Sequence, residues 1–283
     1  MEYFLQIAVF IFGTIIGSFL NVVILRYGRK SLTGRSVCPN CGKKLQWFEL
    51  VPLVSFFFLG RKCRGCQQKI SWQYPLVEIV TGILFLTIFN SQFPVFNQFS
   101  IHNFQFLNLI ILWVIFSLLI VIFVYDFLHK IIPDLLVFLF IGLSVIPILG
   151  GFDTLSGNWW NFSWGTRLWA GPVLALPFAG LWFFSKGKWI GLGDAKLAWG
   201  IGWLLGFAKG LSAIILGVWL GALVGLLLIF LPRVIPKQRL FFKGKNFTMK
   251  SELPFAPFLI IGLLLVVFLK WDVWSLGSFF NNF

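Results

Sequence analysis

The chain has 283 residues, of which 59% are hydrophobic and 11% are charged, and its formal net charge is +14 at pH 7. Soluble domains carry roughly 25% charged residues, so this composition excludes a soluble globular protein and indicates an integral membrane protein. The basic residues gather in a few loops, as they do in the cytoplasmic loops of membrane proteins, which argues against nucleic acid as a partner and for contact with membrane lipids.

Eight apolar runs follow one another along the chain, each of about 15–23 residues and close to the ~20 that a helix needs to cross a bilayer. They predict an all-α polytopic membrane protein with about eight transmembrane helices. The predicted spans are Tyr3–Leu25, Pro75–Phe89, Phe106–Tyr125, Leu135–Phe152, Leu168–Ser185, Ala195–Ala208, Leu211–Leu231 and Leu253–Leu269. The first run lacks a small-residue cleavage site, so we expect a retained helix. Only Lys209-Gly210 separates the sixth and seventh spans.

Lysine and arginine predict the orientation of the chain. With the N-terminus outside, 20 of the 23 basic residues lie in inner segments and three lie outside. Two basic inner loops are long, Arg26–Tyr74 and Pro232–Glu252, and the second fits either an amphipathic surface segment or a disordered loop. We therefore divide the chain into a first helix (1–25), a cytoplasmic loop (26–74) and a membrane core (75–283).

All four cysteines lie in the first of these loops, as two CxxC pairs. They are Cys38, Cys41, Cys63 and Cys66. Two residues between thiolates let backbone amides point at the sulfurs, and Gly42 and Gly65 suit the tight turns. Four thiolates without histidine fill a tetrahedral coordination sphere, which favours a structural zinc ion. Two disulfides are the alternative, and they are rare on the reducing side of a membrane. A redox role for one CxxC pair is a further alternative.

Two aspartates stand at the ends of apolar runs. Asp126 follows the uncharged run Phe106–Tyr125, and Asp194 lies in Gly191-Leu192-Gly193-Asp194. Carboxylates at such positions are costly, so they are functional candidates by default. The predicted orientation puts both on the cytoplasmic face, where one ionised and one protonated carboxylate could cleave a peptide.

Other readings of these carboxylates stay open. Asp194 and Asp134 could cap helices, and Asp126 could neutralise His129 or Lys130. A proton- or ion-coupled transporter is a second alternative. A non-catalytic assembly factor organised by the cysteine loop is a third.

Supporting residues surround this pair in the sequence. Gly191 and Gly193 would permit close approach of a substrate and positive φ at the turn into the sixth span. Glu78 could neutralise a basic partner or shape the site. Lys196 could stabilise an ionised carboxylate or contact lipid phosphate.

Seven motifs, in order along the chain, resemble those of the type IV prepilin peptidases, the bacterial leader peptidase and methyltransferase family with a GxGD aspartyl motif. They are GSFLNVVILR at 17–26, RSVCPNC at 35–41, PLVS at 52–55, GRKCRGC at 60–66, YPLVE at 74–78, YDFLHKIIPD at 125–134 and GLGDAK at 191–196.

The resemblance implies an aspartyl peptidase of the bacterial inner membrane with Asp126 and Asp194 as its catalytic pair, because the family's first aspartate opens the motif that ends in Pro133-Asp134. It implies that the four cysteines bind zinc. The implied substrates are prepilins or pseudopilins, whose basic leaders end at the cytoplasmic membrane boundary. Methylation of the new N-terminus with S-adenosylmethionine is a further implied activity. The outer loop Gly150–Arg167, with three tryptophans, is longer than the family pattern.

Overall fold

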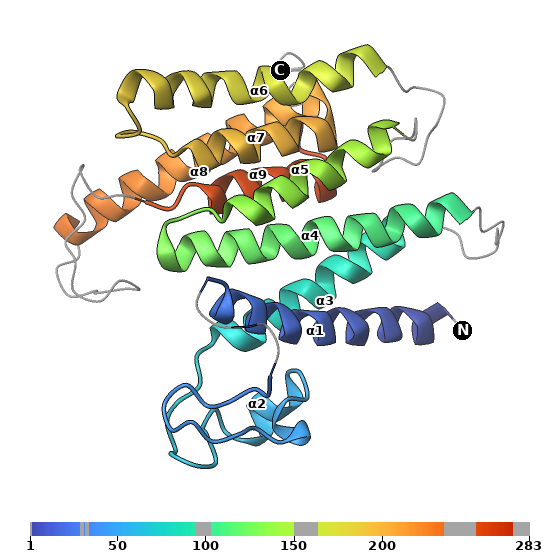
Figure 1. The fold of residues 1–283 in the computed structure, drawn as a ribbon, viewed down its shortest axis with the longest axis vertical. Coiled ribbons are helices and arrows are strands. Elements are labelled where there is room, and N and C mark those ends of the chain that lie inside the picture. Colours follow the sequence, from blue (N-terminus) through green and yellow to red (C-terminus); the bar gives the residue numbers. More distant parts are fainter. Residues whose placement is uncertain are drawn as a thin grey trace. The chain divides into compact units, whose positions relative to one another are not determined.

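The computed structural model describes residues 2–28, 31, 34–93, 103–149, 164–234 and 253–273. In this part of the chain all long elements are helices, shown in Figure 1, and the only β pairing consists of two isolated antiparallel bridges, Val37 with Lys44 and Lys62 with Lys69. The helices are α1 (Glu2–Arg26), η1 (Trp47–Glu49), α2 (Val54–Phe58), α3 (Gln73–Gln92), α4 (Asn103–His129), α5 (Asp134–Leu149), α6 (Trp164–Ser185), α7 (Leu192–Leu205), α8 (Phe207–Val234) and α9 (Ala256–Phe268).

Eight of the described helices coincide with the eight predicted spans, so the all-α, multi-pass prediction is confirmed. Five of them, α1, α3, α4, α6 and α8, are long and apolar enough to cross a bilayer. The remaining three, α5, α7 and α9, have 16, 14 and 13 residues. The predicted break at Lys209-Gly210 is wrong, because both residues lie inside α8. The chain turns instead at Gly206, whose φ of +78° glycine adopts readily.

Most of the two other loops singled out in the sequence falls outside the described residues. Of Pro232–Glu252 only the first three residues are described, at the end of α8. Of Gly150–Arg167 only the last four are described, at the start of α6.

The chain divides into two compact units, and the boundary between them falls inside α4. The first comprises Met1–Val121 with Thr154–Gly157, and the second Ile122–Asp153 with Asn158–Phe283. In the first unit α1 packs along α3. Small residues form this seam: a Cβ at Gly13 would lie 2.8 Å from Cα of Gly82, and a Cβ at Gly17 would lie 2.7 Å from Cα of Glu78. Glycines at a helix seam let two backbones approach closely in a membrane.

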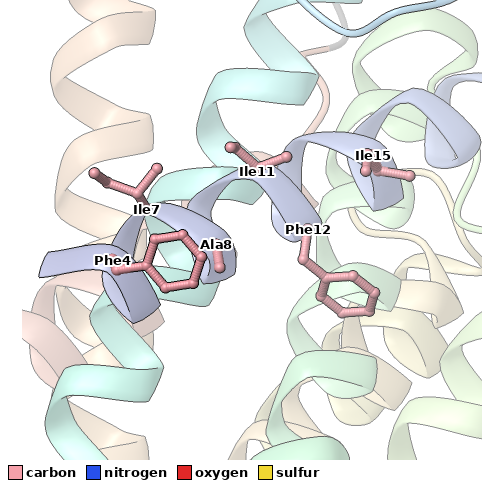
Figure 2. A pocket seen from close by; sticks show the side chains of 6 residues that line it. All are labelled: Phe4, Ile7, Ala8, Ile11, Phe12 and Ile15. Atoms are coloured by element: carbon pink, nitrogen blue, oxygen red, sulfur yellow. The ribbon is translucent and has the colours of Figure 1, made fainter. Parts of the chain in front are cut away.

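The opposite side of α1 is apolar and exposed, as expected for a surface that faces lipid hydrocarbon. An apolar groove along it is shown in Figure 2. Its lining residues are Phe4, Ile7, Ala8, Ile11, Phe12 and Ile15.

In the second unit α7 is the central element, with contacts to α5, α6, α8 and α9. Glycines bring its backbone against these neighbours. A Cβ at Gly202 would lie 2.6 Å from the carbonyl oxygen of Ala170 in α6, and a Cβ at Gly200 would collide with the ring of Phe140 in α5. The helix that carries Asp194 is therefore held within the unit.

Candidate active site and metal centre

Asp126 lies in the last turn of α4 and is 4% exposed. Its Oδ2 accepts a hydrogen bond from the backbone N–H of Ala256, the first residue of α9, at 3.2 Å. The first N–H groups of a helix have no partner inside the helix, so the start of α9 offers a free donor to a carboxylate. This contact joins positions 130 residues apart in the sequence.

Asp194 lies in the first turn of α7 and is 7% exposed. The N-cap of α7 is Gly191 and Asp194 is the third residue of the helix, so Asp194 is not the N-cap, although its carboxyl group contacts the backbone of Gly191. Its Oδ1 is buried and has no hydrogen-bond partner among the described residues. A buried carboxyl oxygen without a partner is costly, which makes Asp194 a candidate functional group.

The structure brings the two aspartates together within the second unit. Figure 1 shows the end of α4 and the starts of α5, α7 and α9 at the same end of this unit. The carboxylate of Asp126 is near enough to act electrostatically on that of Asp194. Both carboxyl groups are thus buried in the second unit and come from separate helices whose ends lie close together.

The glycines before Asp194 act differently from the prediction. Gly191 has a φ of −76°, and Gly193 lies inside α7 without a positive φ, so the expected left-handed turn is wrong. Gly193 instead allows close packing, because a Cβ there would lie 2.8 Å from Cβ of Ile132. Ile132 belongs to the connector between α4 and α5, Lys130–Pro133. The missing side chain thus lets the connector after Asp126 pack against the helix that carries Asp194.

Lys196 and Asp134 form an ion pair beside this contact, with 2.6 Å between Nζ and Oδ1. The side chain of Asp134 is 67% exposed, and that of Lys196 is 20% exposed. Nζ of Lys196 also lies 4.8 Å from the ring centre of Phe138. The sequence predicted that Lys196 could stabilise an ionised carboxylate. In the structure this carboxylate is that of Asp134, the first residue of α5.

Glu78 belongs to the first unit, where it is buried in α3. Its carboxylate accepts a hydrogen bond from the backbone N–H of Leu53 at 2.8 Å. It makes no ion pair with any residue that the structure describes, so the expected basic partner is replaced by a backbone amide.

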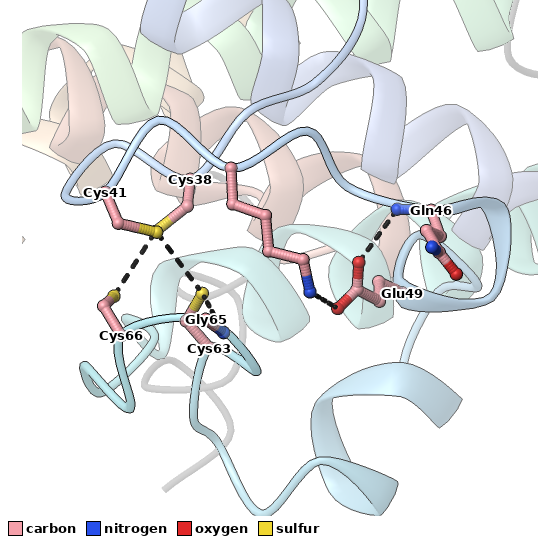
Figure 3. A network of polar contacts seen from close by, with 8 residues as sticks. Cys38, Cys41, Gln46, Glu49, Cys63, Gly65 and Cys66 are labelled. Carbon is pink, nitrogen blue, oxygen red and sulfur yellow. Dashed lines mark hydrogen bonds and ion pairs between the residues drawn. The ribbon is translucent and has the colours of Figure 1, made fainter.

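The four cysteines converge in the first unit. Figure 3 shows the two knuckles facing each other. Their Sγ atoms all lie within 4.8 Å of one another, and none is in a disulfide. The sulfurs of Cys38 and Cys66 are 3.9 Å apart, and those of Cys41 and Cys63 are 4.0 Å apart. Thiolates held about 2.3 Å from a tetrahedral ion lie roughly 3.8 Å apart, so the cluster has the dimensions of a four-thiolate metal site.

The two knuckles have the same backbone plan. The N–H of Cys38 donates to the carbonyl of Lys43, and that of Cys63 donates to the carbonyl of Gln68. The residue after each second cysteine has positive φ, +69° at Gly42 and +56° at Gln67. Gly42 therefore serves the predicted tight turn, while the second knuckle achieves it with a glutamine.

Polar groups favour the thiolate at Cys66 and Cys63, whereas at Cys41 the backbone hydrogen bond from Lys43 is outweighed by desolvation and the neighbouring sulfurs, which raise the pKa to about 11. The backbone N–H of Gln68 and then the side-chain amide of Asn40, at 3.6 Å, lower the pKa of Cys66 to about 6. Backbone N–H groups of Cys66 and Gly65 likewise lower the pKa of Cys63. Amides pointing at the sulfurs were predicted from the CxxC spacing, whereas Asn40 was not.

Two further contacts at these sites could not be predicted from the pattern of side chains in the sequence. Near the first knuckle, Glu49 accepts from the N–H of Gln46 at 2.8 Å and pairs with Lys43 at 3.3 Å. At the aspartates, Ala256 contributes only its backbone N–H, which any residue except proline could supply.

The fold and these sites define a multi-pass membrane protein with a pair of buried carboxyl groups and a separate four-cysteine centre. Residues 11–92 match the family model of the bacterial peptidase A24 N-terminal domain, and residues 113–226 match that of the type IV leader peptidase family. The second match contains both Asp126 and Asp194. The chain belongs to the type IV leader peptidase family.

Similar proteins carry corresponding names. Over 78 residues the chain is 50% identical to a prepilin leader peptidase/N-methyltransferase of Myxococcus xanthus, covering 27% of this chain and 23% of that protein. Proteins of the same name from Vibrio cholerae and Aeromonas hydrophila are 36% and 29% identical. The Vibrio match covers 52% of this chain and 58% of the relative, and the Aeromonas match covers 69% and 72%. No solved structure gives a significant match.

Proposed function

We propose that this protein is a membrane-embedded aspartyl endopeptidase that removes the basic leader from prepilins or pseudopilins at the cytoplasmic membrane boundary. The proposal is supported most directly by the paired, buried carboxyl groups of Asp126 and Asp194, which lie on separate helices at one end of the second unit. Membership of a leader peptidase family is the second support.

Peptide hydrolysis by this pair needs one ionised and one protonated carboxyl group. The ionised group takes a proton from water as the water oxygen attacks the scissile carbonyl carbon. The protonated group donates to the carbonyl oxygen, and a proton then passes to the leaving nitrogen as the C–N bond breaks. In this scheme Asp126 and Asp194 are interchangeable as acid and base.

The location of the pair suits a prepilin. Such a substrate has a short basic leader followed by an apolar helix, so its scissile bond lies where the helix leaves the lipid. Because the leader and the inner loops of this protein are both basic, long-range electrostatic attraction should not favour binding. We infer that substrate reaches the site by lateral diffusion in the bilayer and by helix packing.

Asp126→Asn and Asp194→Asn test this function. In proteoliposomes with a purified prepilin, each variant should lose at least about 100-fold in cleavage rate, the usual contribution of a general acid or base. Asp134→Asn is the matched control, because Asp134 belongs to the same stretch of sequence but is exposed, and it should retain cleavage. Helical content and membrane insertion should be unchanged in all three.

The same variants separate the alternatives. Cleavage that survives in either single variant contradicts the peptidase proposal. A transporter predicts wild-type cleavage together with loss of proton- or ion-coupled flux in the two variants. An assembly factor predicts normal pilus formation in cells that carry both substitutions.

We propose zinc as the metal of the four-cysteine centre. Its four soft thiolate ligands and near-tetrahedral spacing suit zinc and leave no open position, so the ion would be structural. Metal analysis of the purified protein should find one zinc per chain and none in the variant with all four cysteines changed to serine. A wild-type protein that is folded without metal contradicts the proposal.

We further propose that the enzyme methylates the new N-terminus, as the names of its relatives indicate for those proteins. S-adenosylmethionine would be the methyl donor. No group of described side chains can be assigned to this cofactor. Incubation with prepilin and labelled cofactor should transfer label to the cleaved product, and cleavage without transfer would leave a peptidase alone.

A further inference from the structure

The short helix α2 presents an apolar surface outside the helices that cross the membrane. Its inner side chain, Phe56, is 5% exposed and packs 5.1 Å from the ring of Trp72. Its outer side chains are open: Phe58 is 88% exposed, Phe57 61% and Val54 51%. An apolar cluster of this kind marks a surface that interacts with a partner or with lipid.

Glu78 ties the start of α2 to the first turns of α3, a helix that is long and apolar enough to cross a membrane. Its carboxylate accepts the N–H of Leu53, the residue directly before α2, at 2.8 Å. Glu78 is the sixth residue of α3, so it lies about 7.5 Å along the helix axis from the first residue at a rise of 1.5 Å per residue. Interfacial helices bury their apolar face about 5–10 Å into the boundary between headgroups and acyl chains.

The backbone at this contact is strained. Leu53 has a φ of +60°, and the N–H of Val54 bonds to the carbonyl of Pro52 at 2.6 Å, which forms a γ-turn. A leucine keeps this conformation only where its surroundings fix it. Glu78 therefore fixes the direction in which α2 leaves the turn.

The charge around α2 complements an anionic surface. Residues 26–74 contain ten basic residues and one acidic residue, Glu49, which is already paired with Lys43. Trp47 is 79% exposed on the same segment. Tryptophan is enriched at the headgroup level of membranes, and each basic residue near an anionic leaflet adds to the attraction.

We propose that α2 is an interfacial anchor, with Phe57 and Phe58 inserted among the acyl chains and the basic residues of the segment in contact with anionic headgroups. The occupant of this surface is thus lipid. The anchor holds the four-cysteine segment against the membrane, and the inference does not depend on the proposed peptidase activity.

Photocrosslinking of the full chain in nanodiscs tests the anchor. The photoreactive residue p-benzoylphenylalanine is placed at Phe58 and, as a matched control, at the exposed Gln68 of the second knuckle. In phosphatidylcholine with phosphatidylglycerol, position 58 should give lipid adducts by mass spectrometry, and position 68 should give none. Crosslinks from position 58 to a second copy of the chain or to added prepilin in place of lipid, or equal lipid adducts at both positions, overturn the proposal.

Glu78 variants provide a second test with the same readout. Glu78→Ala should lower the lipid adduct yield at position 58 about fivefold, the change in an equilibrium that one net hydrogen bond produces. Glu78→Gln keeps an oxygen acceptor for the N–H of Leu53 and should preserve the yield. Equal yields in the two variants would contradict the role of Glu78, and equal yields in purely neutral lipid would contradict the role of charge.

Discussion

Asp126 and Asp194 are both buried, yet their oxygens have different partners. Oδ2 of Asp126 accepts a hydrogen bond from the backbone N–H of Ala256, whereas Oδ1 of Asp194 has no hydrogen-bond partner among the described residues. The cost of a carboxylate beside an apolar run was enough to single out both residues in the sequence. Ala256 could not be found in the same way, because a backbone N–H has no signature in a side-chain pattern and its partner is 130 positions away.

At the metal centre, Asn40→Ala should make metal binding more sensitive to acid. Metal binding requires thiolates, so affinity falls as the pH is lowered. The side-chain amide of Asn40 helps to lower the pKa of Cys66 to about 6, and removing it should raise that pKa. The variant should therefore release zinc at a higher pH than the wild type, as measured with a chromophoric chelator between pH 7 and pH 4.

Gln68→Ala is the control for this prediction. Gln68 acts on Cys66 through its backbone N–H, which the substitution keeps, so its release curve should follow that of the wild type. Identical curves for Asn40→Ala and wild type would show that the Asn40 amide does not act on the bound thiolate.

The helices were easier to predict from the sequence than the residues at which they begin and end. Runs of apolar residues predicted eight helices of the described part of the chain, because helices in a bilayer consist predominantly of apolar residues. The boundary between α7 and α8 was misplaced by a few residues, since Gly202, Gly206 and Gly210 recur every four positions and only one of them turns the chain. Gly206 has positive φ, whereas Gly210 lies in α8, where a Cβ would be 2.7 Å from Cδ1 of Leu174. Which glycine serves conformation and which serves packing depends on tertiary contacts.

Within α7, Gly202→Ala should destabilise the protein by about 1–3 kcal/mol, because its methyl group would meet the carbonyl of Ala170 and the backbone would have to move. Gly142→Ala in α5 is the matched control. Its Cβ would meet nothing within 4 Å, so it should leave stability unchanged or raise it by up to about 1 kcal/mol. Unfolding in detergent with increasing denaturant, followed by circular dichroism, measures both. A Gly202→Ala variant as stable as Gly142→Ala would mean that the α6–α7 seam is looser than described.

For the whole molecule, the distribution of basic residues predicts the orientation in the membrane, which the positions of the helices alone do not. Twenty basic residues fall in segments that we place inside and three in segments that we place outside. The helices fix which segments share a side of the membrane, but only this asymmetry indicates which side faces the cytoplasm. The four cysteines lie in a single loop between α1 and α3, whereas Asp126 and Asp194 come from different helices whose ends we place on the same side.

Trypsin should therefore reach the two long basic segments from one side of the membrane only. In inverted membrane vesicles it should cut within residues 26–74 and 233–250, which contain sixteen of the basic residues. In right-side-out vesicles these segments should stay intact. Mass spectrometry of the released peptides identifies the cuts, and fragments of residues 26–74 from right-side-out vesicles would reverse the orientation.

The close contacts of α7 have a consequence for how the carboxyl pair adapts to a substrate. The helix packs closely against its neighbours at three of its glycines. Gly193 lies against Ile132, Gly200 against Phe140 and Gly202 against Ala170. Interiors packed at this density do not deform continuously. In the proposed enzyme we therefore expect Asp194 to keep its position when a peptide binds. We expect any adjustment of the pair to come from the side chain of Asp126, whose carboxylate accepts a single hydrogen bond from the backbone of α9.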